Sequence, residues 1–585
     1  MNISNIIRIF TVTFNTEYDM FKTNSQLNLF SYTTELSKKQ RELLDNSKEK
    51  WFYKLIFSNI DEMTFKPLYS TKASRPNVAA NILVSAMILK EFRGISYNEL
   101  MESVMFDMRF KTALGMVSID EQPFSRATLF NFQNRILEYE EQTGINLIEL
   151  VFDNLTAQQI KQLKLKTDIQ RTDSTLISSN IKKYSRVQLL IEVLIRLERI
   201  LQEEDKTQIN KLLQVYLKTG SDKYVYALKS NELPRELENL GKVYHAIHTI
   251  INGKATYEGE KAFINFERVY KEHFVVVHEQ ASPKANNELN SSMLQSPDDQ
   301  EATYRKKRDQ HSKGYTINGT ETANPENPVQ LVTDVGVNPN NVDDSVILNQ
   351  RIENLKEKTP ELNEIHTDGG YGSQDNDKVL LKLEITQITT AVRGRESEII
   401  KKIEQPDEKS ESYIVECPHQ KATSTPTPKR HKAQFDLSIC KSCPLNQKCQ
   451  IFKDKGRCYF NHDDYLRNKR NRNINNIPKE RRKIRPNVEA LMKEFKTQTR
   501  AGKLKVRGLF KTSLFAYNMG IAINFGRIYR YVSEKDIKEA FSLNLKVFLA
   551  KISSKKTNSK LPNKIISTNI EIKNLFYNFT PVNQV

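Results

Sequence analysis

An interrupted strand pattern places the strongest constraint on how this chain folds. Residues 163–177 alternate apolar and polar side chains, as a half-buried strand does. The pattern then changes, because apolar residues recur at helical spacing from Val187 to Leu201. Strand patterns return between residues 314 and 337. We therefore expect one sheet whose first strand is separated from its partners by a helical insertion over residues 185–300.

Further elements follow the resumed strands in a definite order. They are a helix at 343–358, a strand at 361–367, a helix at 377–383 and a strand at 385–392. An order of three strands, helix, strand, helix and strand is that of the ribonuclease H-like fold, so we predict an α/β protein with a mixed five-stranded core. The expected parts are a helical N-terminal domain (30–150), the core (160–184 and 301–395), the helical insertion (185–300), an irregular Cys-rich segment (396–465), a basic segment with a late helix that completes the core (466–535) and a loose tail (553–585).

Two carboxylates stand at related places in this order. Asp173 lies on the first strand, and Asp368 follows the fourth strand directly before Gly369 and Gly370. In this fold order the two positions lie side by side. Carboxylate oxygens suit Mg²⁺, and two-metal phosphoryl transfer requires carboxylates that converge from different elements. A solvated strand-end Asp is the alternative for either residue alone, whereas the pair at matching positions favours a metal site.

The third carboxylate is expected on a helix after the last strand. A candidate helix begins at Arg485 and Pro486, and Pro is well suited to a first helical turn. Arg485, Glu489, Lys493 and Lys496 are spaced so that they share one face of this helix. Such a row is typical of exposed ion pairs, and equally of a metal ligand flanked by bases that bind phosphate.

Three blocks of sequence resemble the catalytic blocks of DDE transposases from bacterial insertion sequences, which share the ribonuclease H-like superfamily with retroviral integrases. The blocks are Thr172-Asp173-Ser-Thr, His366-Thr-Asp368-Gly-Gly-Tyr371 and Arg485-x3-Glu489-x3-Lys493. The similarity is to the subgroup with a helical N-terminal domain and a Cys-rich segment before the final Glu. Further matches, within a resemblance that spans residues 30–530, are Arg75-Pro76, Lys313-Gly314-Tyr315 and Arg507-Gly508 with Asn524.

The resemblance implies that Asp173, Asp368 and Glu489 bind Mg²⁺ (or Mn²⁺). It also implies that water cleaves a phosphodiester at each element end, and that the freed 3′-OH then attacks target DNA. The implied partners are double-stranded DNA, as element ends and as target, and a second copy of the chain in the DNA complex. Arg485 and Lys493 would bind phosphates near the cut. Arg482 departs from the family pattern, because related enzymes carry a Tyr there that contacts DNA.

Two other functions remain open at this point. A ribonuclease H-like nuclease or resolvase would use the same metal chemistry without strand transfer. A domesticated DNA-binding protein would have lost catalysis, although an intact set of Asp, Asp and Glu argues against it.

The cysteines predict a second metal site. All five lie between residues 417 and 458, and clustering of this kind favours a metal site in a reducing cytosol over a disulfide framework. Two thiolates spaced as Cys440-x2-Cys443 can chelate one Zn²⁺. We expect Cys417 and Cys449 to complete a structural zinc site, with Cys458, His419 and His431 as reserve ligands. The alternative is a set of reduced, unligated thiols.

Charge predicts the partner. The chain carries a formal net charge of +18, which favours nucleic acid over a merely solvated surface. It has no stretch of about 20 apolar residues that would span a membrane and no secretion signal, so we expect a cytoplasmic, nucleoid-associated protein (Met20 is an alternative start).

The two ends of the chain are expected to divide DNA binding between them. Between Arg467 and Arg485 lie nine basic residues and one acidic residue, which would neutralise the DNA backbone, with Arg481 and Arg482 as examples. The alternative is a solvated loop. The N-terminal helices would read base edges through Arg126 and Thr128, near a helix start that Ser125 is expected to cap.

Overall fold

The computed structural model describes residues 21, 23–24, 32–70, 77–307, 309–391, 401–407, 410–478 and 481–554. The side chains of residues 475–476, 482 and 535–554 lie outside this description. The chain divides into two units, residues 1–527 and 528–585, and each is described by itself. The Arg75-Pro76 block and the expected tail beyond residue 554 therefore lie outside the described residues.

The N-terminal region is helical. Gly94, in the left-handed conformation at φ 65°, ends one helix, and the side chain of Ser125 caps another by accepting a hydrogen bond from the backbone N–H of Thr128. The segment from 97 to 113 forms two helices, because Asp107 is extended and its side chain caps the second. The helices are α1 (Lys38–Asp45), α2 (Lys48–Leu55), α3 (Ala80–Arg93), α4 (Tyr97–Phe106), α5 (Met108–Ala113), α6 (Arg126–Thr143) and α7 (Leu147–Leu163).

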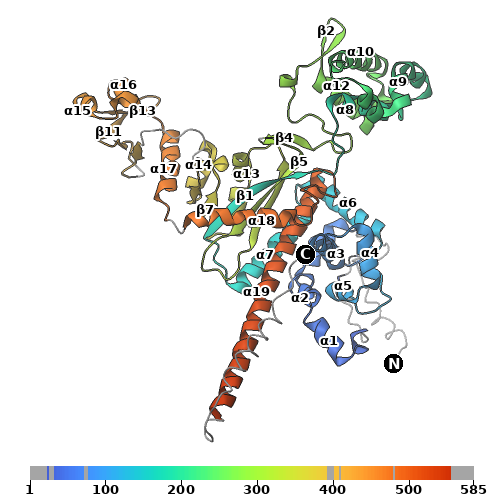
Figure 1. Cartoon of the computed structure of the whole chain (residues 1–585), viewed down its shortest axis with the longest axis horizontal. Helices are drawn as coiled ribbons and strands as arrows, with labels where there is room; N and C mark the ends of the chain where they lie inside the picture. Colours follow the sequence, from blue (N-terminus) through green and yellow to red (C-terminus); the bar gives the residue numbers. More distant parts are fainter. Residues whose placement is uncertain are drawn as a thin grey trace, which may run out of the picture. The chain divides into compact units, whose positions relative to one another are not determined.

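The central sheet has six strands in the order β4-β5-β1-β7-β8, with β6 paired to β5. Strand β1 pairs with β5 in antiparallel and with β7 in parallel orientation, as a mixed sheet requires (Figure 1). The strands are β1 (Ile169–Ser178), β4 (Thr303–Lys307), β5 (Gln310–Thr322), β6 (Val332–Pro339), β7 (Glu364–Thr367) and β8 (Thr386–Thr389), and the connecting helices are α13 (Asp344–Lys358) and α14 (Gln374–Lys382).

This arrangement corrects the expected five strands in two ways. Strand β4 was missed, because its charged residues pair only with the first half of β5 and show no apolar alternation. Strand β1 begins at Ile169 rather than at Leu163, which is the last residue of α7. The α/β architecture with a mixed sheet and many helices is consistent with a ribonuclease H-like core.

The block between β1 and β4 is the expected helical insertion. It has a hydrophobic core of its own, in which Leu190, Leu194, Tyr244 and Phe266 are fully buried. A two-stranded hairpin follows the helices. The elements are α8 (Arg186–Glu198), α9 (Glu203–Ala227), α10 (Leu233–Ile251), α11 (Ala255–Glu258), α12 (Lys261–His273), β2 (Phe274–Val277) and β3 (Gln280–Pro283).

The Cys-rich segment is a small module rather than an irregular region, which corrects the prediction. Its five antiparallel strands follow the order β13-β12-β11-β10-β9. They are three to six residues long, and one face is buried, so apolar residues are too few and too closely spaced to mark strands in the sequence. The elements are β9 (Lys402–Glu404), β10 (Ile414–Glu416), β11 (Lys421–Pro426), β12 (His431–Gln434), α15 (Leu437–Ser442), α16 (Gln450–Lys453) and β13 (Arg457–Phe460).

Three helices complete the described chain. Helix α17 (His462–Asn476) packs against β8 and α14 of the core and against β9 of the Cys-rich module. Helix α18 (Val488–Lys496) lies on β1 and β5, and α19 (Leu509–Ser554) runs from the first unit into the second. No helix in the described part of the chain is long and apolar enough to span a membrane.

Candidate active site

The register of the sheet brings the first two predicted carboxylates together. Strands β1 and β7 are parallel, and Ile169, Gln170 and Arg171 pair with Glu364, Ile365 and His366. The same register, continued by two residues, sets Asp173 beside Asp368. The Asp368 side chain accepts a hydrogen bond from the backbone N–H of Gly370, at 2.8 Å, which fixes the carboxylate at the end of β7.

A glycine on the strand next to β1 lets helix α18 approach the sheet. Gly319 on β5 pairs with Asp173, and a Cβ at Gly319 would lie 3.0 Å from the Phe495 ring and 3.2 Å from the side chains of Leu491 and Met492. These three residues form the apolar stripe of α18. The helix therefore packs onto the sheet directly beside Asp173.

Buried ion pairs hold this helix in register. Arg171, two residues before Asp173, donates to Glu321 on β5 and to the backbone carbonyl of Ile484. Arg527 on α19 pairs with the other oxygen of Glu321 and with Glu494 on α18. Both ends of the late helix are thus tied to the strands that carry the first carboxylate.

One guanidinium contacts all three predicted carboxylates. Nη2 of Arg485 lies 2.9 Å from Oδ2 of Asp173 and 3.8 Å from Oδ2 of Asp368. Nη1 of the same residue lies 3.5 Å from Oε1 of Glu489. The side chain of Asp173 is 13% exposed, that of Asp368 35% and that of Glu489 72%, so the cluster opens to solvent on the side of α18.

The cluster holds more negative charge than Arg485 neutralises. Burial raises the pKa of Asp173 to about 6. Arg485 and the backbone N–H of Ser174 act in the opposite direction, while Asp368 and Asp344 raise the pKa further. Burial is the larger cause and the neighbouring acids add to it, so Arg485 alone does not return the pKa of Asp173 to its ordinary range.

Asp344 is a fourth acid that the sequence did not assign to the site. Its Oδ1 accepts a hydrogen bond of 2.6 Å from the Ser174 hydroxyl, and burial raises its pKa. In the sequence, Asp343 and Asp344 are two adjacent acids at the start of the helix expected at 343–358. Asp343 does cap α13, whereas Asp344 contacts β1. The pairing of β1 with distant strands was needed to find it.

The acids fit a hard divalent cation in donor type, since all four offer only carboxylate oxygens. As the side chains stand, no group of three or more His, Cys, Asp or Glu residues among those described is arranged to hold a metal ion. The Arg485 guanidinium lies among the three carboxylates instead. Its buried Nε has no hydrogen-bond partner among the described atoms, as expected of a group that is only partly satisfied.

The cysteines predicted to bind zinc, all within the described part of the chain, also lie close together, and they too are not arranged to hold a metal ion. Cys417, Cys440, Cys443 and Cys449 line one small pocket together with His419. Burial raises the pKa of Cys440, and the other three thiols raise it further. Cys458 lies apart, buried on β13 with Lys401 Nζ at 3.9 Å, and His431 stacks on Phe460. The four cysteines expected as ligands thus share one pocket.

Most described bases of the predicted backbone-binding run pair with carboxylates. Arg467 contacts Asp464, Arg470 contacts Asp377, Arg472 contacts Glu404 and Arg481 contacts Glu364. The side chain of Arg482 lies outside the described residues. These contacts position α17 against the core and the Cys-rich module, a role that the charge pattern alone did not reveal.

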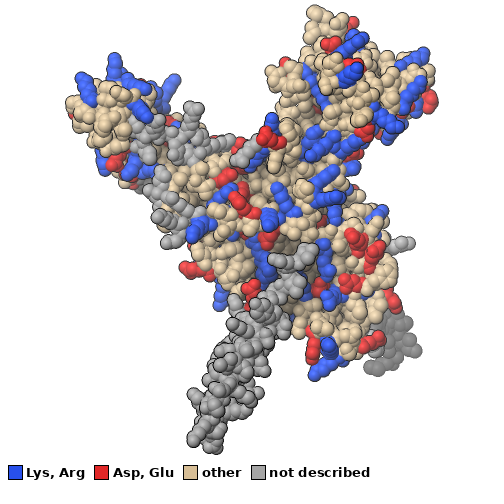
Figure 2. All heavy atoms as spheres, viewed as in Figure 1, with Lys and Arg blue, Asp and Glu red and all other residues tan. Residues whose placement is uncertain are grey.

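The basic residues on α18 differ in their surroundings from those of the run before it. Lys493 is exposed. The pKa of Lys496 is lowered by burial and by the positive charge of Lys307 on β4. Figure 2 shows Lys and Arg side chains gathered where β5 meets the beginning of α19.

The predicted base-reading residues lie at the start of α6. Arg126 is exposed and donates to the Asn98 side chain at 3.0 Å. The hydroxyl of Thr128 takes part in the Ser125 cap. Thr128 is therefore committed to the helix end, whereas Arg126 extends beyond it.

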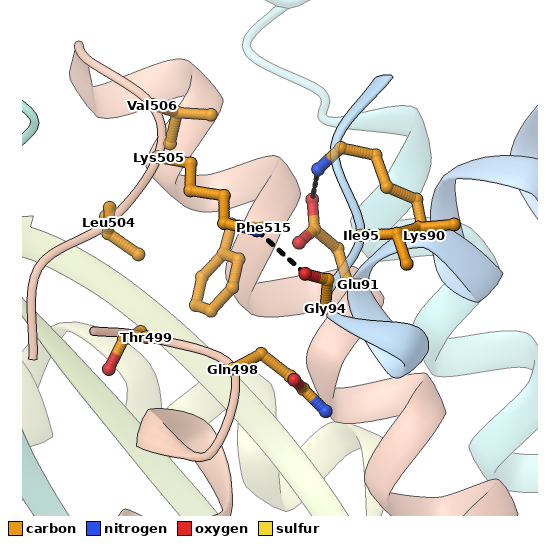
Figure 3. Close-up of a pocket in the computed structure, with 10 residues that line it drawn as sticks. All are labelled: Lys90, Glu91, Gly94, Ile95, Gln498, Thr499, Leu504, Lys505, Val506 and Phe515. Atoms are coloured by element: carbon orange, nitrogen blue, oxygen red, sulfur yellow. Dashed lines mark hydrogen bonds and ion pairs between the residues drawn. The ribbon is translucent and has the colours of Figure 1, made fainter. Parts of the chain in front are cut away.

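The segment after α18 caps a helix of the N-terminal domain. Lys505 Nζ donates to the carbonyl of Gly94 at 2.7 Å, and Gln498 donates to the carbonyl of Phe92 at 3.0 Å (Figure 3). Gly94 has a φ of +65°, a left-handed conformation that favours glycine at this end of α3. The segment that leaves the candidate active site thus contacts the end of α3 directly.

Comparison with known families gives two matches. A family model described as a transposase DDE domain covers residues 411–529, which include Glu489 and the cysteines. A second model, described as a transposase domain, covers residues 40–135. No curated protein and no solved structure matches the chain.

Proposed function

The chain belongs to the DDE transposases of insertion sequences, and we propose that it cleaves DNA at the ends of its element and joins those ends to target DNA. The proposed catalytic residues are Asp173, Asp368 and Glu489. The observation that carries the proposal is the contact of one guanidinium, that of Arg485, with all three carboxylates.

The acid cluster supports divalent-metal chemistry. Asp173, Asp368 and Glu489 would hold Mg²⁺ (or Mn²⁺), which supplies the Lewis acid for the attacking and the leaving oxygen. Binding of a cation would release Arg485 from the carboxylates. Its guanidinium would then be free to pair with a DNA phosphate at the same place.

The proposed reaction has two displacements. Water oxygen bonds to phosphorus at the element end while the bond to the 3′ oxygen breaks, and this oxygen leaves as a 3′-OH. In strand transfer the same hydroxyl oxygen bonds to a target phosphorus and displaces the 3′ oxygen of the target strand. No protein nucleophile is needed, so the chain contributes ligands, positioning and phosphate contacts.

DNA contacts are proposed on three elements. Lys493 and Lys496 would bind phosphates beside the cut. Arg481 and Arg482 would follow the backbone, which for Arg481 requires exchange of its Glu364 partner. Arg126 and Thr128 would read the element end, chiefly through Arg126. A homodimer, with one element end on each copy, would act on the nucleoid in the cytoplasm.

A structural zinc ion is proposed for the Cys-rich module. Cys417, Cys440, Cys443 and Cys449 fit it, since all four thiols line one pocket and thiolates are the preferred ligands of structural zinc. Zinc would offset the mutual repulsion of the thiolates.

Cleavage of a labelled element-end duplex tests the proposed function. We expect cleavage with Mg²⁺, none with EDTA, and loss of cleavage in Asp368→Asn and in Glu489→Gln. Asp375→Asn is the matched control, because Asp375 is an exposed acid on α14 of the same core. Cleavage that persists in both variants would contradict the assignment.

Strand transfer separates the remaining alternatives. Pre-cleaved ends incubated with a plasmid should become joined to it. Cleavage without joining would favour a ribonuclease H-like nuclease, and specific binding with neither reaction would favour a domesticated DNA-binding protein.

A further inference from the structure

The sheet of the Cys-rich module has one covered and one open face. Ala433 and Cys458 point into the module, where Ile451 of α16 joins them in a hydrophobic core. Side chains alternate along a strand, so the neighbours Lys432, Arg457 and Tyr459 point the other way. Lys432 and Tyr459 pair directly across β12 and β13.

Positive charge on the open face is not balanced. The acids of this sheet are paired, Glu416 with Lys421 and Glu404 with Arg472. Within the described residues, Arg430, Lys432 and Arg457 make no ion pair. Figure 2 shows Lys and Arg side chains spread around the module that contains β11 and β13.

The aromatic ring of Tyr459 lies among these basic side chains. The Tyr459 side chain is an exposed hydrophobic group, with 38% of its surface accessible. The Arg430 guanidinium, from the β11–β12 turn, lies over the ring at 3.9 Å from its centroid. A cation–π pair of this kind holds the ring in place without covering it by a hydrophobic neighbour.

We propose that this open face binds an unpaired DNA strand, with a base stacked on Tyr459 and phosphates on Arg430, Lys432 and Arg457. A base that replaces Arg430 on the ring leaves the guanidinium beside the phosphate of the same nucleotide. Surfaces that bind single strands combine basic side chains, which contact phosphates, with aromatic rings, on which nucleobases stack. A duplex hides the faces of its nucleobases from such rings. The inference rests on the proposed function, because cleavage at an element end would supply the unpaired strand.

Helix α17 makes contacts with both the core and the module. Arg470 pairs with Asp377 of α14, and Arg472 donates to Ile403 O of β9. Asn468 exchanges hydrogen bonds with Lys401 and Ile403.

Binding of two fluorescent probes by the full-length protein tests the proposal. One probe is an element-end duplex, and the other is the same duplex with an oligothymidine tail. Tyr459→Ala should weaken binding of the tailed probe about tenfold and that of the duplex less than twofold, and Tyr459→Phe should restore it. Lys441→Gln, an exposed base on α15, is the control and should change neither affinity.

A second variant changes charge instead of the aromatic ring, so that the proposal is still tested if Tyr459→Ala misfolds. Lys432→Gln combined with Arg457→Gln removes no buried group, and it should reduce the salt dependence of tail binding. Unchanged tail affinity in both variants, or an equal loss for both probes, would overturn the proposal. Asp173→Asn should bind both probes normally and fail to cleave. If it cleaves, the proposed function fails while the result on Tyr459 still stands.

Discussion

Two clusters of acids lie on the same core, and they are built differently. In the first, Arg485 alone serves Asp173, Asp368 and Glu489. In the second, Glu149 and Asp153 of α7 and Asp334 of β6 share two bases of α13, Arg351 and Lys358.

The second cluster is nearly neutral and joins three elements. Arg351 binds both oxygens of Asp334 at 2.6 and 2.7 Å, and its Nη2 lies 2.9 Å from Glu149. The Tyr517 hydroxyl donates to the other oxygen of Glu149. The pKa of Asp334 is lowered despite burial, because Arg351 and Lys358 outweigh it. Compensated acids of this kind stabilise a fold, whereas an uncompensated cluster is suited to bind added cations.

Neutralising one acid of the first cluster should have the largest effect. We expect Asp173→Asn to lower cleavage on the order of 10³-fold, since a metal ligand contributes several kcal/mol to the transition state. The free energy of unfolding should stay the same or rise, because the variant removes an excess charge. Cleavage assays measure the first effect and urea denaturation the second. A variant that is less stable but still cleaves would contradict the proposed difference between the two clusters.

Removing a base from the second cluster should have the opposite outcome. Arg351→Met leaves Asp334 and Glu149 buried without their main partner, which should lower the free energy of unfolding by about 3–5 kcal/mol. Cleavage by the remaining folded protein should persist at low temperature. Equal stability of variant and parent would show that this cluster does not hold the fold.

The fourth acid offers a smaller and sharper test. Asp344→Asn keeps the Ser174 contact possible but reduces the negative charge beside Asp173. We expect the Mg²⁺ concentration for half-maximal cleavage to rise about tenfold, as for groups that support a metal ligand, with little change at saturating Mg²⁺. An unchanged Mg²⁺ titration would exclude Asp344 from the site.

The smallest expected effect is a pH dependence in the second cluster. Burial raises the pKa of Asp153 to about 6, although Lys358 lies 2.9 Å away. An acid with a raised folded pKa destabilises the fold above that pKa, and the penalty disappears as pH falls from 6 toward 4. Asp153→Asn should therefore be more stable than the parent at pH 7, and no more stable near pH 4. A difference that grows on acidification would contradict the sign.

The sequence predicted the parts that short-range patterns encode. Ser125 caps a helix where expected, because cap chemistry is local. The proposal of Asp173 and Asp368 as site residues depends on the same kind of pattern, because each stands at a strand pattern of its own. The helical insertion was recognised from apolar spacing alone.

Other features depend on pairing between distant residues. Asp344 joins the site only through Ser174, 170 residues away, and Arg481 meets Glu364 across 117 residues. The dense charge before α18 was interpreted without its partners, which come from β7, β9 and α14. The sheet of the Cys-rich module escaped notice because its strands are too short to show an alternation.

The distance along the chain between Asp173 and its counter-ion has a consequence for synthesis. Arg485 follows Asp173 by 312 residues. At about 5–20 residues/s, a ribosome needs roughly 16–60 s to reach it after Asp173 is made. During that time the nascent chain carries the strand and the insertion but neither Arg485 nor Glu489. A chain released early by a stop codon or a stalled ribosome therefore lacks Glu489, one of the three proposed metal ligands, together with the arginine that contacts all of them.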